Sequence, residues 1–179
     1  MSRRRIFAGT GRPEPEPAEG IASNGLERES VWDYPRPPRV EAEPRRVEVR
    51  LGGVEIAVSE AALRVLETSH PPAIYIPPAD IAPEALEPAH GTSFCEWKGT
   101  ARYFDVVAGE ARERRVGWTY PAPTVGFEAL ADHVSFYPGR LECTLGGEPV
   151  SAQPGNFYGG WLTAEIVGPV KGPPGSELW

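Results

Sequence analysis

The residue types best suited to chemistry lie together in one short run of the sequence. Residues 95–99 read Cys-Glu-Trp-Lys-Gly, and Tyr103 and Asp105 follow closely. The run combines a thiol, a carboxylate, an amine and aromatic rings in a segment whose composition is typical of a β-strand. Its spacing matches no catalytic or metal-binding motif, so it predicts where a site lies but not which reaction or ligand the site serves.

Strand geometry limits how these residues can work together. Alternation places Cys95 and Trp97 on one face and Glu96 and Lys98 on the other, with Cys95 and Lys98 about 10 Å apart. A catalytic Cys95 activated by Lys98 is therefore disfavoured, and we expect Cys95 in the core. Two interpretations of Lys98 stay open. It forms a solvated ion pair, or it points into a concave cleft, where partial burial would lower its pKa and make it a general base, an imine former or an anion anchor.

Two further polar residues are candidate partners of Lys98. Glu67 comes shortly before the rigid Pro71-Pro72 pair, a position from which its side chain can point into a cleft. A carboxylate beside an ammonium can exchange a proton with it, although Glu67 could equally cap neighbouring backbone amides. The candidate catalytic residues are Lys98, Glu67 and Tyr103.

Aromatic side chains supply the expected walls of the cleft. The chain carries more of them between residues 75 and 137 than a core of this size hides without partners for their polar tips. Several of them around one cleft would form a pocket for a planar or cationic ligand, and the alternative is that most are core or rim. The candidate ligand-binding residues are Tyr75, Trp97, Trp118, Tyr120, His70 and Cys95.

Neither a metal nor a cofactor is expected. The three histidines, at positions 70, 90 and 133, lack the short spacings of a preformed metal site, and the chain has no Cys-x-x-Cys pair. The sequence also has no redox-cofactor motif and no phosphate-binding loop of the P-loop type.

Composition indicates a mainly β protein with an acidic surface. The 179 residues include 21 Pro and 20 Gly, which disfavour long helices and favour short strands and turns. A net charge of −7 argues against nucleic acid as a partner, and the one basic cluster, residues 3–5, lies in a terminal arm. The chain has no bilayer-length apolar run, no signal-peptide core and only two cysteines. We therefore expect a cytoplasmic protein with reduced thiols, no membrane partner and a small-molecule ligand, and a homodimer stays open.

Short-range patterns predict three hairpins. Alternating apolar residues flank Gly-Gly turns within residues 47–58 and 141–150. A third hairpin is expected from a strand over residues 94–107 that turns near Gly109 and returns through residues 115–120.

The remaining patterns are shorter. Residues 59–67 fit either a short helix or a strand, residues 74–76 fit a strand, and apolar spacings of three and four predict a helix over residues 124–134. The chain then divides into a flexible Pro/Glu-rich arm (1–28), an extended aromatic and Pro-rich segment packed on the body (29–46), a core domain (47–138) and a C-terminal hairpin with a wrapping tail (139–179).

A combination of motifs within residues 47–138 resembles the bacterial and fungal domain-of-unknown-function family 427, also labelled nucleotidyltransferase-like. The residues that carry the resemblance are Gly53, Ile56, Arg-Val-Leu-Glu-Thr at 64–68, Tyr-Ile-Pro at 75–77, Cys-Glu-Trp-Lys-Gly at 95–99, Tyr103, Trp-Thr-Tyr-Pro at 118–121 and Phe-Tyr-Pro at 136–138. The flanks resemble those of longer actinobacterial members. The resemblance implies a β-tent-like (Mss4-like) fold and no particular activity. The structural zinc of many β-tent relatives is not expected, because its cysteine pairs are missing.

We therefore expect a small antiparallel β-tent-like domain with one or two short helices and extended N- and C-terminal segments. The leading hypothesis is an aromatic-lined cleft that binds a small molecule through Glu67, Lys98 and Tyr103. The second is that this cleft is the active site of a non-redox acid/base enzyme of the cyclase, isomerase or lyase type. The third is a structural or protein-interaction module that presents the Pro-rich arm and the aromatic tail.

Overall fold

The computed structural model describes residues 13–179, so the basic cluster at residues 3–5 and the first part of the predicted arm lie outside the described residues. Within them the chain is mainly β with antiparallel sheets, which confirms the predicted fold class. The helical elements among these residues are three 3₁₀ turns, η1 (Pro78–Asp80), η2 (Pro83–Ala85) and η3 (Glu128–Leu130). No helical element within the described residues has the length and apolarity needed to span a bilayer.

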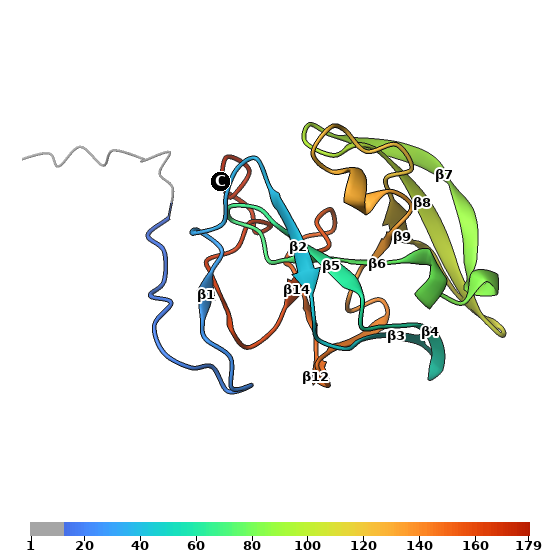
Figure 1. Ribbon diagram of the computed structural model, residues 1–179, viewed down its shortest axis with the longest axis horizontal. Helices are drawn as coiled ribbons and strands as arrows, with labels where there is room; N and C mark the ends of the chain where they lie inside the picture. Colours follow the sequence, from blue (N-terminus) through green and yellow to red (C-terminus); the bar gives the residue numbers. More distant parts are fainter. Residues whose placement is uncertain (1–12) are drawn as a thin grey trace, which may run out of the picture.

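Seven strands form the larger sheet. In spatial order they are β2 (Arg39–Glu43), β5 (Ala62–Leu66), β6 (Ala73–Ile76), β10 (Val134–Phe136), β9 (Ala111–Thr119), β8 (Gly99–Ala108) and β7 (Leu86–Cys95). Every neighbouring pair is antiparallel. The long strands β7, β8 and β9 lie together on the right of the molecule in Figure 1. Most of the candidate site lies at the end of these strands where β7 and β9 end and β8 begins, and on the neighbouring strands.

The remaining strands form one four-stranded sheet and two strand pairs. They are β12 (Glu148–Pro149), β11 (Glu142–Leu145), β3 (Val47–Leu51) and β4 (Val54–Ser59) in one sheet, β1 (Glu29–Ser30) with β15 (Ile166–Val167), and β13 (Ser151–Ala152) with β14 (Trp161–Leu162). The main apolar core draws side chains from both larger sheets, among them Val47, Ile56, Ile76 and Phe136, and also contains Trp161 of β14. Removal of this apolar surface from water is the main force that holds the two sheets together.

Local sequence patterns gave correct hairpins but one wrong helix. The predicted hairpins at 47–58 and 141–150 are β3–β4 and β11–β12, and residues 59–67 contain strand β5 rather than a helix. The helix predicted over residues 124–134 is wrong: the segment holds only η3 and the start of β10. Gly126 (φ 94°) and Asp132 (φ 60°) adopt left-handed backbone conformations that a right-handed helix cannot include.

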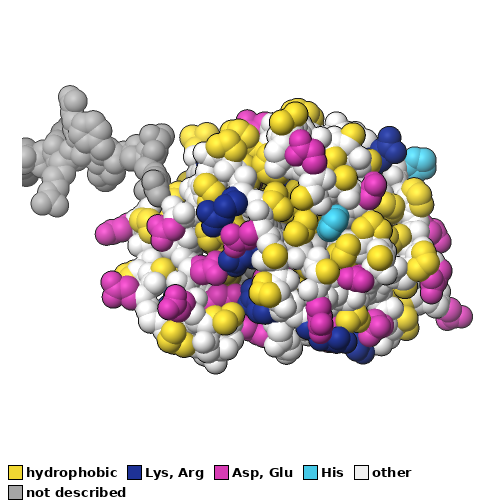
Figure 2. All heavy atoms as spheres, viewed as in Figure 1, with side chains coloured by type: hydrophobic (Ala, Val, Ile, Leu, Met, Phe, Trp, Pro, Cys, Tyr) yellow, Lys and Arg dark blue, Asp and Glu magenta, His cyan; other side chains and the backbone are white. Residues whose placement is uncertain are grey.

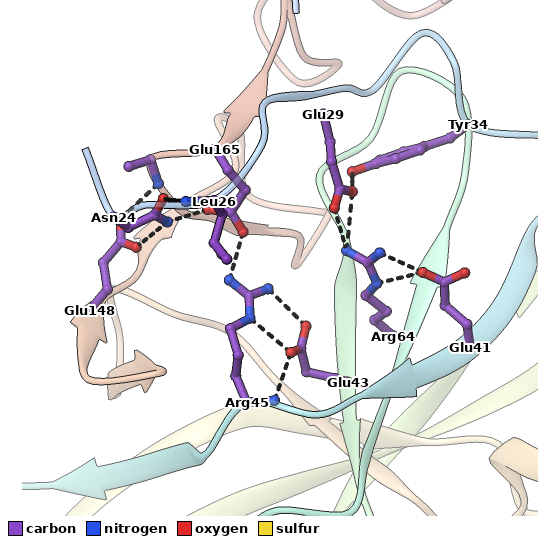
Figure 3. A network of polar contacts seen from close by, with 11 residues as sticks. Asn24, Leu26, Glu29, Tyr34, Glu41, Glu43, Arg45, Arg64, Glu148 and Glu165 are labelled. Carbon is purple, nitrogen blue, oxygen red and sulfur yellow. Dashed lines mark hydrogen bonds and ion pairs between the residues drawn. The ribbon is translucent and has the colours of Figure 1, made fainter. Parts of the chain in front are cut away.

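Polar side chains tie the N-terminal segment and the C-terminal tail to the body (Figure 3). Arg45 lies between Glu43 and Glu165, with guanidinium-to-carboxylate distances of 2.7–2.8 Å. Asn24 donates hydrogen bonds of 2.7 Å to both Glu148 and Glu165. Residues of four separate segments therefore meet in one network, and part of the segment predicted as a flexible arm is hydrogen-bonded to the body.

Candidate functional site

The run at residues 95–99 forms the tip of the β7–β8 hairpin. Strand β7 ends at Cys95 and β8 begins at Gly99, so residues 96–98 form the turn between them. Gly99 has a φ of 97°, a conformation that glycine adopts without strain. The strand predicted over residues 94–107 is therefore wrong at its start. The placement of Cys95 and Lys98 on opposite faces fails with it, because a turn does not alternate.

A neighbouring loop holds this tip in place. The backbone N–H of Thr124 donates to the Lys98 carbonyl at 3.2 Å, and the Thr124 hydroxyl donates to the Trp97 carbonyl. Lys98 is 8% exposed as a result, which is unusual for a lysine.

The hairpin tip forms one wall of a cleft of about 460 Å³, a size typical of small-molecule sites. The opposite walls come from the ends of β5 and β6, from β8 and β9, and from the C-terminal tail. All nine residues proposed from the sequence line it: Lys98, Glu67, Tyr103, Tyr75, Trp97, Trp118, Tyr120, His70 and Cys95. The structure thus brings them together, and their roles stay predictions.

Lys98 carries a positive charge in this cleft at neutral pH. Burial alone would lower the pKa of Lys98, but the interactions of the ammonium with Tyr75, Cys95 and Glu67 outweigh burial, and the pKa is raised above its ordinary value. The expected lowering of this pKa is therefore wrong. An ammonium cannot serve as a general base or as the free amine that forms an imine, whereas it suits an anion anchor.

Glu67 lies between two cations. Its carboxylate oxygens are 3.9 Å from the Lys98 ammonium and 3.8 Å from the Arg36 guanidinium. Arg36 is held by a 2.9 Å hydrogen bond to the Thr68 carbonyl, directly after Glu67. Both distances are longer than a direct hydrogen bond, so Glu67 accepts no hydrogen bond from either cation.

Aromatic rings form the floor of the cleft. Tyr75, Trp118 and Tyr120 are buried, and the Trp118 indole donates to the Tyr75 hydroxyl at 3.2 Å. The Tyr137 ring lies 4.6 Å from that of Trp118 and donates its hydroxyl to the Phe157 carbonyl. Burial raises the pKa of Tyr75 and Tyr120, and that of Tyr137 to about 12, so these hydroxyls stay protonated and neutral.

His70 is a neutral hydrogen-bonding group. Burial and the charges of Lys171, Arg36 and Lys98 lower its pKa to about 3. The Gln153 side chain donates to His70 Nδ1 at 3.1 Å, and its orientation is fixed because it also donates to the Lys171 carbonyl and accepts from the Gly160 N–H. With Nδ1 accepting, the proton of the neutral ring is on Nε2.

The sequence did not point to Arg36, Gln153 or Lys171, which also line the cleft. Each comes from a segment outside the predicted core domain. One signal was available, because the chain has only two lysines, and Lys98 and Lys171 both line this cleft.

Cys95 was expected in the core and instead lies half-buried in the cleft wall, while Cys143 is buried. Trp97 contributes an indole N–H that is buried without a hydrogen-bond partner among residues 13–179. A donor in this state costs free energy, which an acceptor on a ligand would recover. Within the same residues, no three His, Cys, Asp or Glu side chains are grouped closely enough to hold a metal ion.

A family profile described as a domain of unknown function (DUF427) matches residues 39–147, more than half of the chain. The matched region contains the hairpin tip, Glu67 and the aromatic floor, whereas Arg36, Gln153 and Lys171 lie outside it. No curated protein matches the chain.

Proposed function

The chain belongs to the DUF427 family, and from the geometry of its cleft we propose that it binds a small organic anion with a planar or aromatic part. The observation that carries the proposal is the buried Lys98 ammonium among aromatic rings. A buried ammonium that is only partly neutralised strongly favours a negatively charged group beside it.

The charges around the cleft support an anionic ligand. Three cationic side chains, Arg36, Lys98 and Lys171, line it together with two acidic ones, Glu67 and Glu96, in a protein whose net charge is −7. The Lys171 ammonium also donates at 3.1 Å to a main-chain oxygen of the terminal residue, Trp179, so Lys98 and Arg36 are the cations that the proposal uses. On the face shown in Figure 2, most basic side chains lie beside acidic ones. The low-dielectric aromatic walls strengthen the attraction of the Lys98 ammonium for an anion.

The shape of the cleft supports a planar group. Rings of Tyr75, Trp118, Tyr120 and Tyr137 form one continuous cluster, with centroid distances between 4.6 and 6.3 Å. Such walls bury a ring and leave its polar substituent to the lysine and arginine side chains.

Matched ligand pairs test this proposal. Benzoate with benzamide, nicotinate with nicotinamide, and indole-3-acetate with indole-3-acetamide differ in charge but hardly in shape. We expect the carboxylates to shift the indole N–H resonances of Trp97 and Trp118 at lower concentration than the amides do. The Lys98→Met variant keeps the aliphatic stem and should bind carboxylates about tenfold or more weakly, since it loses a charge-assisted hydrogen bond.

Arg50→Met is the matched control, because Arg50 is on β3 and lines no part of the cleft. Its affinities should equal those of the wild type. Equal binding of carboxylates and amides, or full carboxylate affinity in Lys98→Met, would contradict the proposal.

A second candidate is an acid/base enzyme of the isomerase, cyclase or lyase type. It is favoured by the 3.9 Å approach of the Glu67 carboxylate to the Lys98 ammonium, which places a base beside a proton donor. In this candidate Glu67 removes the proton and Lys98 donates one. A metabolite extract incubated with wild-type protein should lose a compound to an isomer or a dehydrated product, and Glu67→Gln should not produce this change. Identical extracts after both incubations would exclude the enzyme.

A further inference from the structure

A second hollow of about 750 Å³ adjoins the cleft. Six residues line both hollows: Ser93, Tyr103, Tyr137, Gln153, Phe157 and Tyr158. The Tyr103 hydroxyl lies 2.8 Å from the Ser93 hydroxyl, so these two side chains are joined at the boundary between the hollows.

The charged side chains that line this second hollow are all basic. They are Arg114, Arg115 and Arg140, with no Asp or Glu among the lining residues. Arg140 is paired at 2.9 Å with Glu113, which lies outside the lining. The three arginines carry a charge of +3 and Glu113 balances one of them, so the hollow keeps a net charge of about +2, from Arg114 and Arg115.

The sheet is irregular where it presents Arg115. Phe104 pairs with Gly117 and Val106 with Glu113, so β9 carries two more residues than β8 across this interval. Arg115 lies within the bulge with a φ of 49°, a strained value for a residue other than glycine. Its backbone N–H donates to the Asp105 carboxylate at 2.9 Å, and this bond, with that from Arg112, lowers the pKa of Asp105.

Strand β7 makes room for the same side chain. The Arg115 guanidinium lies 4.2 Å from the centre of the Tyr103 ring and donates to the His90 carbonyl. A Cβ at Gly91 would lie 2.6 Å from Arg115 Nη1, and the β7–β8 register shifts at this point. Irregularities on both sides of β8 thus converge on one guanidinium. Bulges of this kind re-aim side chains next to binding sites.

We propose that Arg114, Arg115 and Arg140 form a subsite for a phosphate-like dianion on the ligand whose ring occupies the cleft. The part of this inference that concerns the ring rests on the proposed function, whereas the anion subsite stands on its own residues. Guanidinium groups form paired hydrogen bonds with phosphate oxygens, and a net charge near +2 matches a dianion better than a single carboxylate.

Inorganic phosphate tests the subsite without a ring. The full chain is titrated at constant ionic strength, and the arginine Nε–H resonances are followed by NMR. We expect saturable shifts at Arg114, Arg115 and Arg140, with about tenfold weaker binding in Arg115→Gln and in the exposed Arg114→Gln. Arg114→Gln keeps the test valid if the strained position does not tolerate Arg115→Gln.

Two controls separate this inference from the proposed function. Arg50→Gln should bind phosphate as the wild type does, and so should Lys98→Met, because neither residue lines the second hollow. Non-saturating shifts, equal shifts at all arginines, or phosphate affinity retained in both arginine variants would overturn the subsite. A parallel titration with succinate should show weaker binding, and equal or tighter binding of succinate would overturn the phosphate assignment.

Discussion

The network in Figure 3 allows the effect of one substitution to be worked out from its charges. Glu43 and Glu165 are 2% and 1% exposed, and Arg45 is the guanidinium between them. The three side chains together carry a charge of −1. Arg45→Met would leave two buried carboxylates with a charge of −2, and uptake of one proton restores −1.

The cost of this proton uptake sets the expected loss of stability in Arg45→Met. Protonation at pH 7 of a glutamate with an unfolded pKa of about 4.3 costs about 3.7 kcal/mol, at 1.36 kcal/mol per pH unit. This value falls within the range of about 3–5 kcal/mol typical of a broken buried ion pair. It is a large share of the roughly 5–15 kcal/mol by which domains are stable.

The same reasoning gives the pH dependence. In the wild type the pKa of Glu165 is lowered, since hydrogen bonds from its own backbone N–H and from Arg45, Thr163 and Asn24 outweigh burial. Its contribution to stability is therefore present above the unfolded pKa and is lost as pH falls through the folded pKa. In Arg45→Met the shared carboxyl pKa should rise instead, so the loss of stability should shrink to about 1 kcal/mol at pH 5.

Urea unfolding of wild type and Arg45→Met measures the loss of stability at pH 7 and at pH 5. Arg46→Met is the matched control, because the Arg46 guanidinium is 51% exposed and pairs with Glu48, whose side chain is 26% exposed. The stability of this variant should change little. Glu165→Gln in the Arg45→Met background should restore most of the loss at pH 7. A loss below about 1 kcal/mol at pH 7, or an equal loss at both pH values, would refute the reasoning.

Two further predictions concern single groups at the cleft and in the core. With a pKa lowered to about 3, His70 should stay neutral with the proton on Nε2 between pH 4 and 8, and its burial should reduce stability as pH falls from about 6.5 towards 3. Long-range ¹⁵N NMR of the ring checks this, and titration near pH 6.5 would contradict it. Iodoacetamide should modify one thiol in the native chain, because burial raises the pKa of Cys143 to about 12 while Cys95 lines the cleft. Cys95→Ser should abolish labelling and Cys143→Ser should leave it unchanged, and two labelled thiols would show that Cys143 is accessible.

The fold was readable from the sequence where local rules were strong. Gly-Gly turns between alternating apolar residues specify β3–β4 and β11–β12, because both the turn and the register are local properties. The helix expected over residues 124–134 failed for the opposite reason. Leu130 and Val134 have helical spacing, yet one packs from a 3₁₀ turn and the other from strand β10. The spacing of these residues fits a helix and also a 3₁₀ turn followed by a strand, and tertiary packing selects the second.

The members of the site were also readable, but their geometry was not. Residue types identified the nine cleft residues, whereas alternation separated Cys95 from Lys98 because the chain was taken as extended through residue 98. Gly99 was the local signal of a turn. Lys171 and Gln153 could not be found in this way, because long-range packing of the tail brings them to the cleft.

The turn at residues 96–98 changes the chemistry expected of the site. In an extended strand, Lys98 would lie apart from the groups that raise its pKa. Burial would then have the largest effect, and the pKa of Lys98 would fall. The turn instead places the ammonium near Cys95, Glu67 and Tyr75, and its pKa rises. The amine thus changes from a candidate base into a cation at neutral pH. In the binding mode that we propose, this cation and the arginines of the adjoining hollow attract an anionic ligand to one region of an otherwise acidic protein.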